Sequence, residues 1–204
     1  MKYRAQYLGL LLLLSACVPE SVHYYAPMGD GKVTARSRCG GPNEVMTFGK
    51  DGIEVQTFVD IGNWDSFEKD PNRSLRLTLL FSVPEGHTLK IMSDAVQVTV
   101  DGEPAPHQAH LVSPSFCGKE LNQCSLTIGE DVAGGAMVRT WDGRDIYNPK
   151  KSMIGAVEIP DMKVVPKMLD VVLPPMRFDG EEQGPEHIGF KLESGTYSLA
   201  VNGC

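Results

Sequence analysis

The sequence predicts an all-β protein, and three observations support this fold class. Short runs of alternating apolar and polar residues, of which Leu75 to Phe81 is the clearest, have the period of two that is typical of strands. The chain of 204 residues contains 21 Gly, 14 Pro and five Asp-Gly pairs, and this punctuation leaves little room for long helices. No stretch sustains the 3.6-residue period of an amphipathic helix. We therefore expect an antiparallel two-sheet sandwich of immunoglobulin-like type, with about ten short strands.

The first half of the domain contains strand candidates that are separated by turns. Asp51-Gly52 lies between two of them and is typical of a two-residue hairpin, because a type I′ turn needs positive φ at both central positions. The polar segment 60–73 predicts a loop with at most one helical turn. Leu75 to Phe81 predicts a central strand of about nine residues. The other expected strands are Lys32–Arg36, Glu44–Phe48, Ile53–Val59, Leu89–Met92 and Ala95–Val100.

The second half begins with a long loop, residues 103–122, that contains three prolines. Lys163–Leu173 is β-branched and apolar but is interrupted by Pro166, which predicts an edge strand or a bulge, with a helix as the alternative. Further expected strands are Ser125–Ile128, Ala136–Trp141, Ser152–Ile159, a unit from Val171 to Phe178 with a return through Ile188–Leu192, and Tyr197–Val201. The expected core residues are Leu75, Leu77, Leu79, Phe81, Val96, Val98, Val138, Ile154, Leu192, Tyr197 and Leu199.

The N-terminal segment has the pattern of a secretory signal. Lys2 and Arg4 provide a positively charged start. The apolar run from Leu8 to Leu14 that follows is too short for a bilayer span, which needs about 20 apolar residues. The pattern therefore predicts export of the chain. An ordinary buried apolar segment is the alternative interpretation.

The apolar run ends in Leu14-Ser15-Ala16-Cys17, which resembles the lipobox of bacterial lipoproteins. The resemblance implies cleavage before Cys17 and attachment of fatty acyl chains, such as palmitate, to that cysteine. An ordinary signal peptide with a chance cysteine is the alternative. Val18 and Pro19, rather than an Asp, follow the cysteine, which in such lipoproteins implies the outer membrane, with the domain on its periplasmic face. We expect a signal peptide over 1–16, a lipidated tether over 17–31 and a β-sandwich domain over 32–204.

Composition limits the classes of partner. Removal of residues 1–16 leaves 188 residues, enough for one domain with a sizeable core. The formal net charge then changes from −7 to −9, because two basic residues are lost while all 26 acidic residues stay. This acidic balance argues against nucleic acid as a partner and against a basic patch for anionic lipid. The expected contact with the membrane is therefore the lipid anchor itself.

The cysteines agree with an exported protein. If Cys17 is acylated, four remain, and an even number in an oxidising compartment predicts two disulfides. Cys117 and Cys124 are close in sequence and form the simplest local pair, which leaves Cys39 and Cys204 to join the two ends of the domain. The loop-entropy model assigns the long closure about 5 kcal/mol. A metal site at the local pair, which lacks the CxxC spacing, and a free thiol at Cys204 are the alternatives.

Candidate catalytic and metal-binding residues are few. Ser66 and Lys69 match the S-x-x-K of penicillin-binding proteins and β-lactamases, but the Asp-Pro pair that follows ends any helix there, and no S-D-N or K-T-G accompanies them. His107 and His110 lie in a Pro-rich loop without the i, i+4 helical spacing of a zinc pair. We therefore expect no metal and no cofactor, and we assign no catalytic residue.

The segment Trp141-Asp142-Gly143-Arg144 places an aromatic residue among charged ones in a polar loop. We interpret Trp141, Asp142 and Arg144 as a candidate recognition loop, and a plain turn is the alternative. The expected function is a lipid-anchored binding or scaffolding component of the cell envelope, with an envelope protein as its partner. One rival is an accessory lipoprotein of a secretion or pilus assembly, which recruits partners through a sheet edge or loop tip. The other is an envelope-acting hydrolase, which needs a pocket with convergent groups whose pKa values are shifted.

Overall fold

The computed structural model describes residues 20–38, 41–62, 64–105, 107–114, 126–139, 144–184 and 186–197. Within these ranges nearly every regular element is a strand, and the one helix is the six-residue α2 (Trp64–Lys69). All pairs between the named strands are antiparallel. The all-β class and the antiparallel sheets of the sequence prediction are therefore confirmed.

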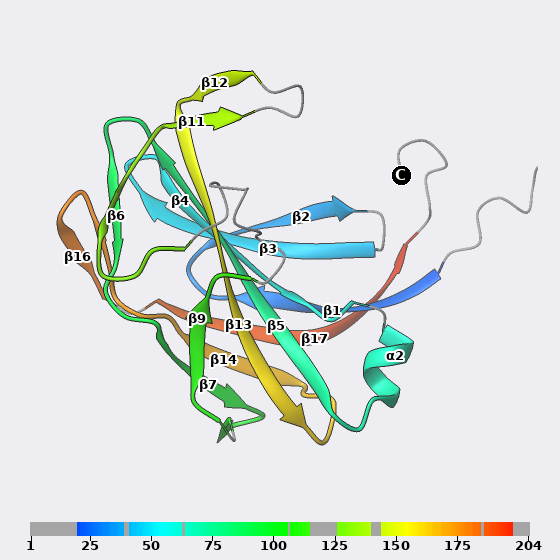
Figure 1. The fold of residues 1–204 in the computed structure, drawn as a ribbon. Helices are drawn as coiled ribbons and strands as arrows, with labels where there is room; N and C mark the ends of the chain where they lie inside the picture. Colours follow the sequence, from blue (N-terminus) through cyan, green and yellow to red (C-terminus); the bar gives the residue numbers. More distant parts are fainter. Residues whose placement is uncertain are drawn as a thin grey trace, which may run out of the picture.

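Most strands belong to one sheet of eleven strands, in the order β1-β17-β14-β7-β9-β13-β5-β4-β3-β2, with the short β8 paired to β7. Figure 1 shows this sheet curling around the body of the molecule. Its strands are β1 (Glu20–Met28), β2 (Lys32–Arg38), β3 (Gly41–Lys50), β4 (Ile53–Asp60), β5 (Arg73–Pro84), β7 (Ala95–Val100), β8 (Glu103–Pro104), β9 (Ala109–Val112), β13 (Lys150–Met162), β14 (Met168–Val172) and β17 (His187–Tyr197).

The large sheet is nearly closed, because β1 at one end of the strand order lies against β3 near the other end. The link from β1 to β2 passes so close to β3 that a Cβ at Gly31 would lie 2.4 Å from Cγ of Met46. Curling follows from strand length, since β5 and β13 pair along almost their whole lengths and long strands accumulate twist. A bulge between Ile159 and Met162 in β13 adds to that twist. This arrangement is not clearly the two-sheet, immunoglobulin-like sandwich that we expected.

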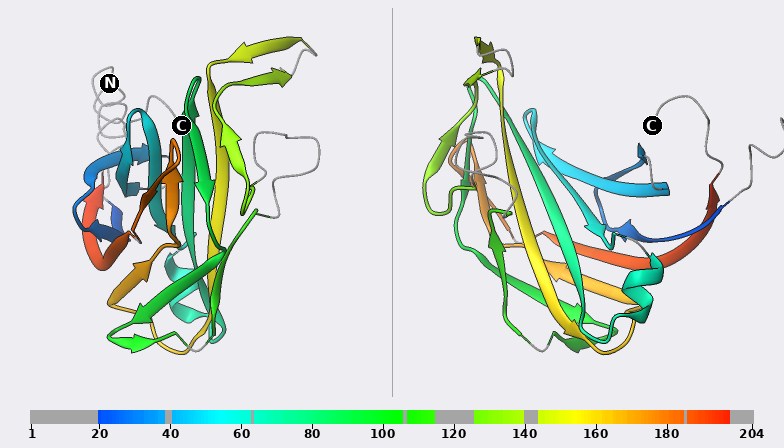
Figure 2. Two further views of the ribbon diagram at one scale, coloured as in Figure 1. Left: turned by 90° about the vertical axis from the view of Figure 1, so that its left-hand side faces the viewer. Right: turned by 45° about the vertical axis from the view of Figure 1, so that its right-hand side comes forward.

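Two smaller sheets complete the described fold. The first has four strands in the order β10-β6-β15-β16, and it contributes Leu89, Val132 and Phe178 to the same hydrophobic core as the large sheet. The second consists of β11 and β12 alone and extends from one end of the molecule (Figures 1 and 2). The strands of these sheets are β6 (Thr88–Ile91), β10 (Asp131–Ala133), β11 (Ala136–Arg139), β12 (Asp145–Asn148), β15 (Met176–Phe178) and β16 (Glu181–Gln183).

The alternating pattern in β5 predicted the centre of the core correctly. The side chains of Leu75, Leu77, Leu79, Phe81, Val96 and Val98 are all buried. Ile154 is only half-buried, because in β13 the inward position belongs to Met153, which lies opposite Phe81. Leu192 is also half-buried and packs against the core. The side chains of Val138, Tyr197 and Leu199 lie outside the described residues.

Turn chemistry was also predicted where Asp-Gly joins two strands. Asp51 and Gly52 have φ angles of 54° and 88°, and the strand residues on either side pair directly, as a two-residue hairpin requires. Asp179 and Gly180 have the same signs of φ between β15 and β16. Glycine adopts a positive φ without steric strain, so only the Asp of each pair is strained in the left-handed conformation. Asp tolerates this conformation better than most residues.

The structure departs from the sequence prediction in the segment before the expected domain. Residues 20–28, which we expected within the tether, form β1 and pair with β17 over their full length. Tyr25 in the middle of β1 is fully buried, and its hydroxyl donates to the carbonyl oxygen of Pro166 at 2.7 Å. Burial and the negative charge of Asp101 raise the pKa of Tyr25, so the hydroxyl keeps its proton. The strand is therefore part of the domain.

The expected edge strand at 163–173 is also corrected. β14 begins after Pro166 and lies between β17 and β7, so it is an interior strand. The proline does not interrupt the ladder because it precedes the strand. Of the expected strand Ser125–Ile128, the described part shows only an isolated bridge between Ile128 and Ile91. The strand expected from Tyr197 onward lies outside the described residues, except for Tyr197 itself, which ends β17.

The helix α2 is fixed to the sheet by Arg73, a buried residue at the start of β5. Its Nε donates to the carbonyl oxygen of Phe67 at 3.1 Å, and its Nη2 donates to that of Glu68 at 2.8 Å. These carbonyls belong to the last turn of the helix, where they have no partner within it, and a cation there also suits the helix dipole. Nη1 reaches the carbonyl oxygen of Met162 at 3.3 Å. Arg73 thereby joins α2, β5 and the end of β13.

We predict that Tyr25→Phe lowers the free energy of unfolding by about 1–3 kcal/mol, because it leaves the buried carbonyl of Pro166 without a donor. Urea titration followed by circular dichroism measures the change. Tyr24→Phe is the matched control, since Tyr24 is half-buried, and it should stay within about 0.5 kcal/mol of the parent. Equal unfolding midpoints for the two variants would show that the β1 contact does not stabilise the domain.

Candidate recognition site

The two-stranded sheet of β11 and β12, here called the β11–β12 arm, extends away from the curled sheet (Figure 2). Its register places Met137 opposite Tyr147 and Val138 opposite Ile146. Within the described ranges, β11 and β12 pair only with each other. The arm carries at its tip, by chain connectivity, the recognition loop predicted from the sequence.

Of that predicted loop, Trp141 and Asp142 lie outside the described residues. Arg144 is described, is exposed, and directly precedes β12. The structure therefore places one of the three predicted recognition residues at the tip-side end of the arm. The contribution of the other two stays a prediction.

The arm exposes large apolar side chains on both of its faces. Met137 is 64% exposed and Tyr147 is 52% exposed, and these two residues lie on one face because they are directly opposite in the ladder. Ile146 is 49% exposed and, as the neighbour of Tyr147 in the strand, points to the other face. A two-stranded sheet has little stability of its own in water, so an arm with this surface needs support from its base or from a partner.

The base of the arm is held by glycines that allow close approach of the backbone. A Cβ at Gly134 would lie 1.7 Å from the carbonyl oxygen of Pro84. The backbone N–H of Gly134 donates to the carbonyl oxygen of His87 at 2.9 Å. Gly135 has a φ of 77°, and a Cβ there would lie 2.4 Å from the hydroxyl oxygen of Tyr147. Gly134 requires glycine because a side chain there would collide with the backbone of β5 and push the arm away from the sheet. Gly135 requires it because its positive φ favours glycine.

The returning strand of the arm is fixed to the same turn. The backbone N–H of Glu85 donates to the carbonyl oxygen of Pro149 at 2.7 Å, and the N–H of Lys150 donates to Oδ1 of Asn148 at 3.0 Å. A hydrogen bond with the carboxylate of Glu85 raises the pKa of Tyr147. Both strands of the arm are thus attached to the turn that follows β5.

A hydrogen-bonded His–Asp pair supports this turn from the other side. Nδ1 of His87 lies 2.7 Å from Oδ2 of Asp179, and the N–H of Thr88 donates to Oδ1 of Asp179 at 2.7 Å. The hydrogen bond from His87, followed by that from Thr88, lowers the pKa of Asp179. Asp179 therefore stays ionised to a lower pH than an ordinary aspartate, and it links the β15–β16 hairpin to the base of the arm.

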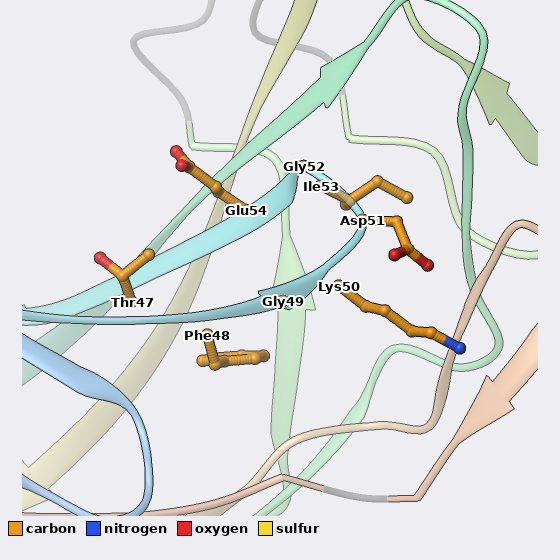
Figure 3. Close-up of a pocket in the computed structure, with 8 residues that line it drawn as sticks. All are labelled: Thr47, Phe48, Gly49, Lys50, Asp51, Gly52, Ile53 and Glu54. Carbon is orange, nitrogen blue, oxygen red and sulfur yellow. The ribbon is translucent and has the colours of Figure 1, made fainter.

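Two of the open hollows are lined entirely by residues that the structure describes. One, of about 280 Å³, is lined by residues 47–54 of the β3–β4 hairpin alone (Figure 3). Lys50 is paired with Glu181, and this contact raises the pKa of Lys50. Figure 3 shows that Glu54 points away from Lys50 and Asp51. These charged groups do not converge on one point. A second open hollow, of about 330 Å³, lies where β1, β14 and β17 meet.

The S-x-x-K residues lie on one helix, as such chemistry requires, but at the surface. α2 is longer than the single turn we expected, and it ends where the Asp-Pro pair predicted. The N–H of Asp70 donates to the carbonyl oxygen of Ser66 at 3.1 Å and closes the last turn. Both Ser66 and Lys69 are exposed, and neither lines the hollows described above. The arrangement gives no support to a nucleophilic serine.

The two histidines that we expected in a loop each face a separate aspartate. That loop prediction, over residues 103–122, is wrong in part, because the segment contains β8 and β9 and His110 lies in β9. Nε2 of His107 lies 3.2 Å from Oδ2 of Asp161, and Nδ1 of His110 lies 3.0 Å from Oδ2 of Asp94. All four side chains are largely exposed. Among the described residues, no group of three or more His, Cys, Asp and Glu side chains is arranged to hold a metal ion. The five cysteines, Cys17, Cys39, Cys117, Cys124 and Cys204, all lie outside the described residues.

Comparison of the chain with protein-family models, curated proteins and solved structures finds no match. In the described part of the chain, no helix has both the length and the apolar character needed to cross a membrane. The site is therefore interpreted from its own geometry.

Sequence reasoning selected the tip of the arm and missed its two faces. Met137 and Tyr147 belong to short alternating runs on either side of Asp142-Gly143, which is a hairpin signal. In each of these runs, however, two apolar residues are adjacent in the sequence, so that each face of the hairpin carries an apolar side chain. This pattern is the signal that could have indicated the two faces. Such a hairpin is either covered on both sides or exposes an apolar surface.

We predict that Gly134→Ala destabilises the domain by about 1–3 kcal/mol and increases amide hydrogen exchange in β11 and β12, because the added Cβ displaces the arm from Pro84. Hydrogen-exchange mass spectrometry measures the local effect. Gly184→Ala is the control, since a Cβ there meets no atom within 4 Å. Unchanged exchange in the arm of the Gly134 variant would contradict the proposed role of this contact.

Proposed function

We propose that this protein is a lipid-anchored component of the bacterial cell envelope whose domain binds another envelope protein through the β11–β12 arm. The observation that carries the binding role is the apolar surface exposed on both faces of the arm, at Met137, Ile146 and Tyr147. Methionine and aromatic residues are enriched in protein interfaces, and contiguous exposed apolar surface is typical of interaction sites. The candidate loop at Trp141, Asp142 and Arg144 adds aromatic and charged groups at the tip.

The anchor is proposed from Leu14-Ser15-Ala16-Cys17, with the chain exported, cut before Cys17 and acylated there. Val18 and Pro19 after the cysteine favour the outer membrane and its periplasmic face. In that oxidising compartment we propose the disulfides Cys117–Cys124 and Cys39–Cys204. Support for the long-range pair comes from Figure 1, where the end of β2, next to Cys39 in the chain, and the end of β17 lie on the same side of the molecule.

The sandwich description of the fold is kept as a proposal. The strands of the curled sheet enclose one core, into which Leu77 from β5 and Leu169 from β14 both project. Opposite walls of such a sheet face each other across the core much as the two sheets of an immunoglobulin-like sandwich do.

An accessory role in a secretion or pilus assembly is a second candidate, and one observation favours it. Because β11 and β12 pair only with each other in the described part of the chain, each has a free edge that can accept a strand from a partner. An envelope-acting hydrolase gains no such support, since the charged groups at the β3–β4 hollow do not converge.

We predict that Cys17→Ser removes the protein from the membrane fraction, because the acyl chains attach to that thiol. Mass spectrometry of the N-terminal peptide and fractionation of cell extracts measure acylation and location. Cys124→Ser is the control, since it leaves the lipobox intact and should stay with the membrane. An unmodified Cys17 within a processed chain would end the lipid-anchor proposal.

We predict that photo-crosslinking residues at Met137, Ile146 and Tyr147 capture the same envelope protein in cells. Val164 is the matched control, because it is 67% exposed and apolar but lies outside the arm. The double variant Met137→Ser, Tyr147→Ser should weaken binding of the captured protein by about 2 kcal/mol or more, as expected for large apolar residues at an interface. Equal capture from Val164, or none from the arm, would contradict the binding role.

A further inference from the structure

We infer that the domain stands on the membrane through the end that carries the start of β1, the end of β17 and α2, here called the anchor end, with Trp64 at the lipid surface. The inference rests on the proposed acylation of Cys17 and adds to it an orientation and a lipid contact. The lipid class that fits this end is a zwitterionic surface such as phosphatidylethanolamine. The β11–β12 arm is then held on the side away from the membrane.

The length of the chain between anchor and fold is the first argument. Only Val18 and Pro19 separate Cys17 from Glu20, the first residue of β1. A fully extended chain covers at most about 3.6 Å per residue, so Glu20 lies within about 11 Å of the acylated residue in any conformation. The headgroup layer on one side of a bilayer is about 5–8 Å thick. The start of β1 is therefore held at or just above the headgroups.

The rigidity of β1 is the second argument. Glu20 pairs with Tyr197 and Met28 pairs with Gly189, so the strand is joined to β17 from end to end. Tyr25 is buried, and its hydroxyl donates to Pro166 at 2.7 Å. Because β1 cannot move as a free tether, holding its first residue at the membrane also limits how the rest of the domain can lie.

The side chains at the anchor end are the third argument. The ring of His23 in β1 stacks on Trp64, with centroids 4.1 Å apart and planes 16° apart, so the start of α2 lies beside the start of β1. Trp64 also contacts Phe67, at 5.9 Å between centroids, and it is neither fully buried nor fully exposed. Tryptophan with one apolar side and one polar side is favoured at the level of lipid headgroups.

Charge decides which lipid this end fits. Glu44 and Glu193 lie close enough to Tyr24 to raise its pKa further, after the larger effect of burial. α2 adds Asp65 and Glu68 against Lys69. Glu193 is paired with Lys191 at 2.6 Å, so the acidic excess among these groups comes from Glu44, Asp65 and Glu68 against Lys69. An end with this excess is repelled by anionic lipid and tolerated by a zwitterionic surface. The acyl chains supply the affinity, and the anchor end supplies the orientation.

The position of the arm completes the orientation. In Figure 1 and in the right-hand view of Figure 2, the β11–β12 arm lies at the top of the ribbon and α2 lies low on the right, with the start of β1 and the end of β17 on the right between these heights. The arm, which carries Met137 and Tyr147, is consequently on the side away from the lipid when α2 faces it. The apolar surface of the arm is thereby available to a protein partner.

The experiment uses the two tryptophans of the chain, Trp64 at the anchor end and Trp141 in the segment that joins β11 to β12. The lipidated protein is reconstituted into vesicles of the zwitterionic lipids phosphatidylethanolamine and phosphatidylcholine that contain a lipid with a nitroxide on its headgroup. Trp141→Phe leaves only Trp64 to be observed, and Trp64→Phe leaves only Trp141. We expect strong loss of Trp64 fluorescence and little loss of Trp141 fluorescence. Equal losses, or a greater loss at Trp141, would overturn the orientation.

A longer tether provides the second variant, and it does not depend on the folding of Trp64→Phe. This variant carries ten Gly and Ser residues inserted between Pro19 and Glu20, in the Trp141→Phe background. The insertion frees the domain from the surface, because a flexible linker spans roughly 5–6 Å times the square root of its number of residues. Quenching of Trp64 should fall in this variant, and unchanged quenching would overturn the argument from chain length. Mass spectrometry of the same samples separates the two proposals. An unacylated Cys17 overturns both the anchor and the orientation, whereas an acylated Cys17 without selective quenching overturns the orientation alone.

Discussion

The pairing of β5 with β13 is the constraint on which the rest of the structure depends. The ladder runs from Lys150 opposite Pro84 to Met162 opposite Arg73, and both strands are longer than the usual five or six residues. Their accumulated twist curls the large sheet until β1 meets β3, and the enclosed volume is filled by the inward row of β5. One end of the ladder becomes the base of the β11–β12 arm, and the other is joined by Arg73 to α2. The core, the base of the arm and α2 are therefore joined through this one ladder.

The sequence predicted those parts of the fold that depend on local chemistry. Leu75 to Phe81 alternate because one face of β5 is buried, and Asp51-Gly52 forms a turn because both residues adopt positive φ. Closure of the sheet was not predictable, since it depends on which distant strands become neighbours. The segment Glu20–Met28 gave no clean alternation, and only its pairing with β17 makes it a strand. Pairing partners of this kind leave no periodic signal in either strand.

The candidate site was predicted at its tip and not on its faces. An aromatic residue among charged ones attracted attention to Trp141, because such a residue has no obvious place in a turn. Met137 and Tyr147 resembled core residues in the sequence, and they differ from core residues only in that no second layer covers them. Whether a strand is covered is decided by the arrangement of whole sheets. The residue pattern of one hairpin therefore does not predict whether that hairpin is buried in the fold or exposed.

The antiparallel pairing of β1 with β17 has a mechanical consequence for a domain held at its N-terminus. If Cys17 is acylated and the arm binds a partner, as we propose, a pull on the arm loads the domain against its anchor, and the load enters the fold through Glu20 at the start of β1. The hydrogen bonds of an antiparallel ladder lie perpendicular to the strands, so a force along the strand shears all of them together and does not peel them off one after another. Burial of Tyr25 adds resistance to sliding, because a shift of the strand would move its hydroxyl away from Pro166. Under the proposed anchoring, β1 would bear the force between the membrane and a partner bound to the arm.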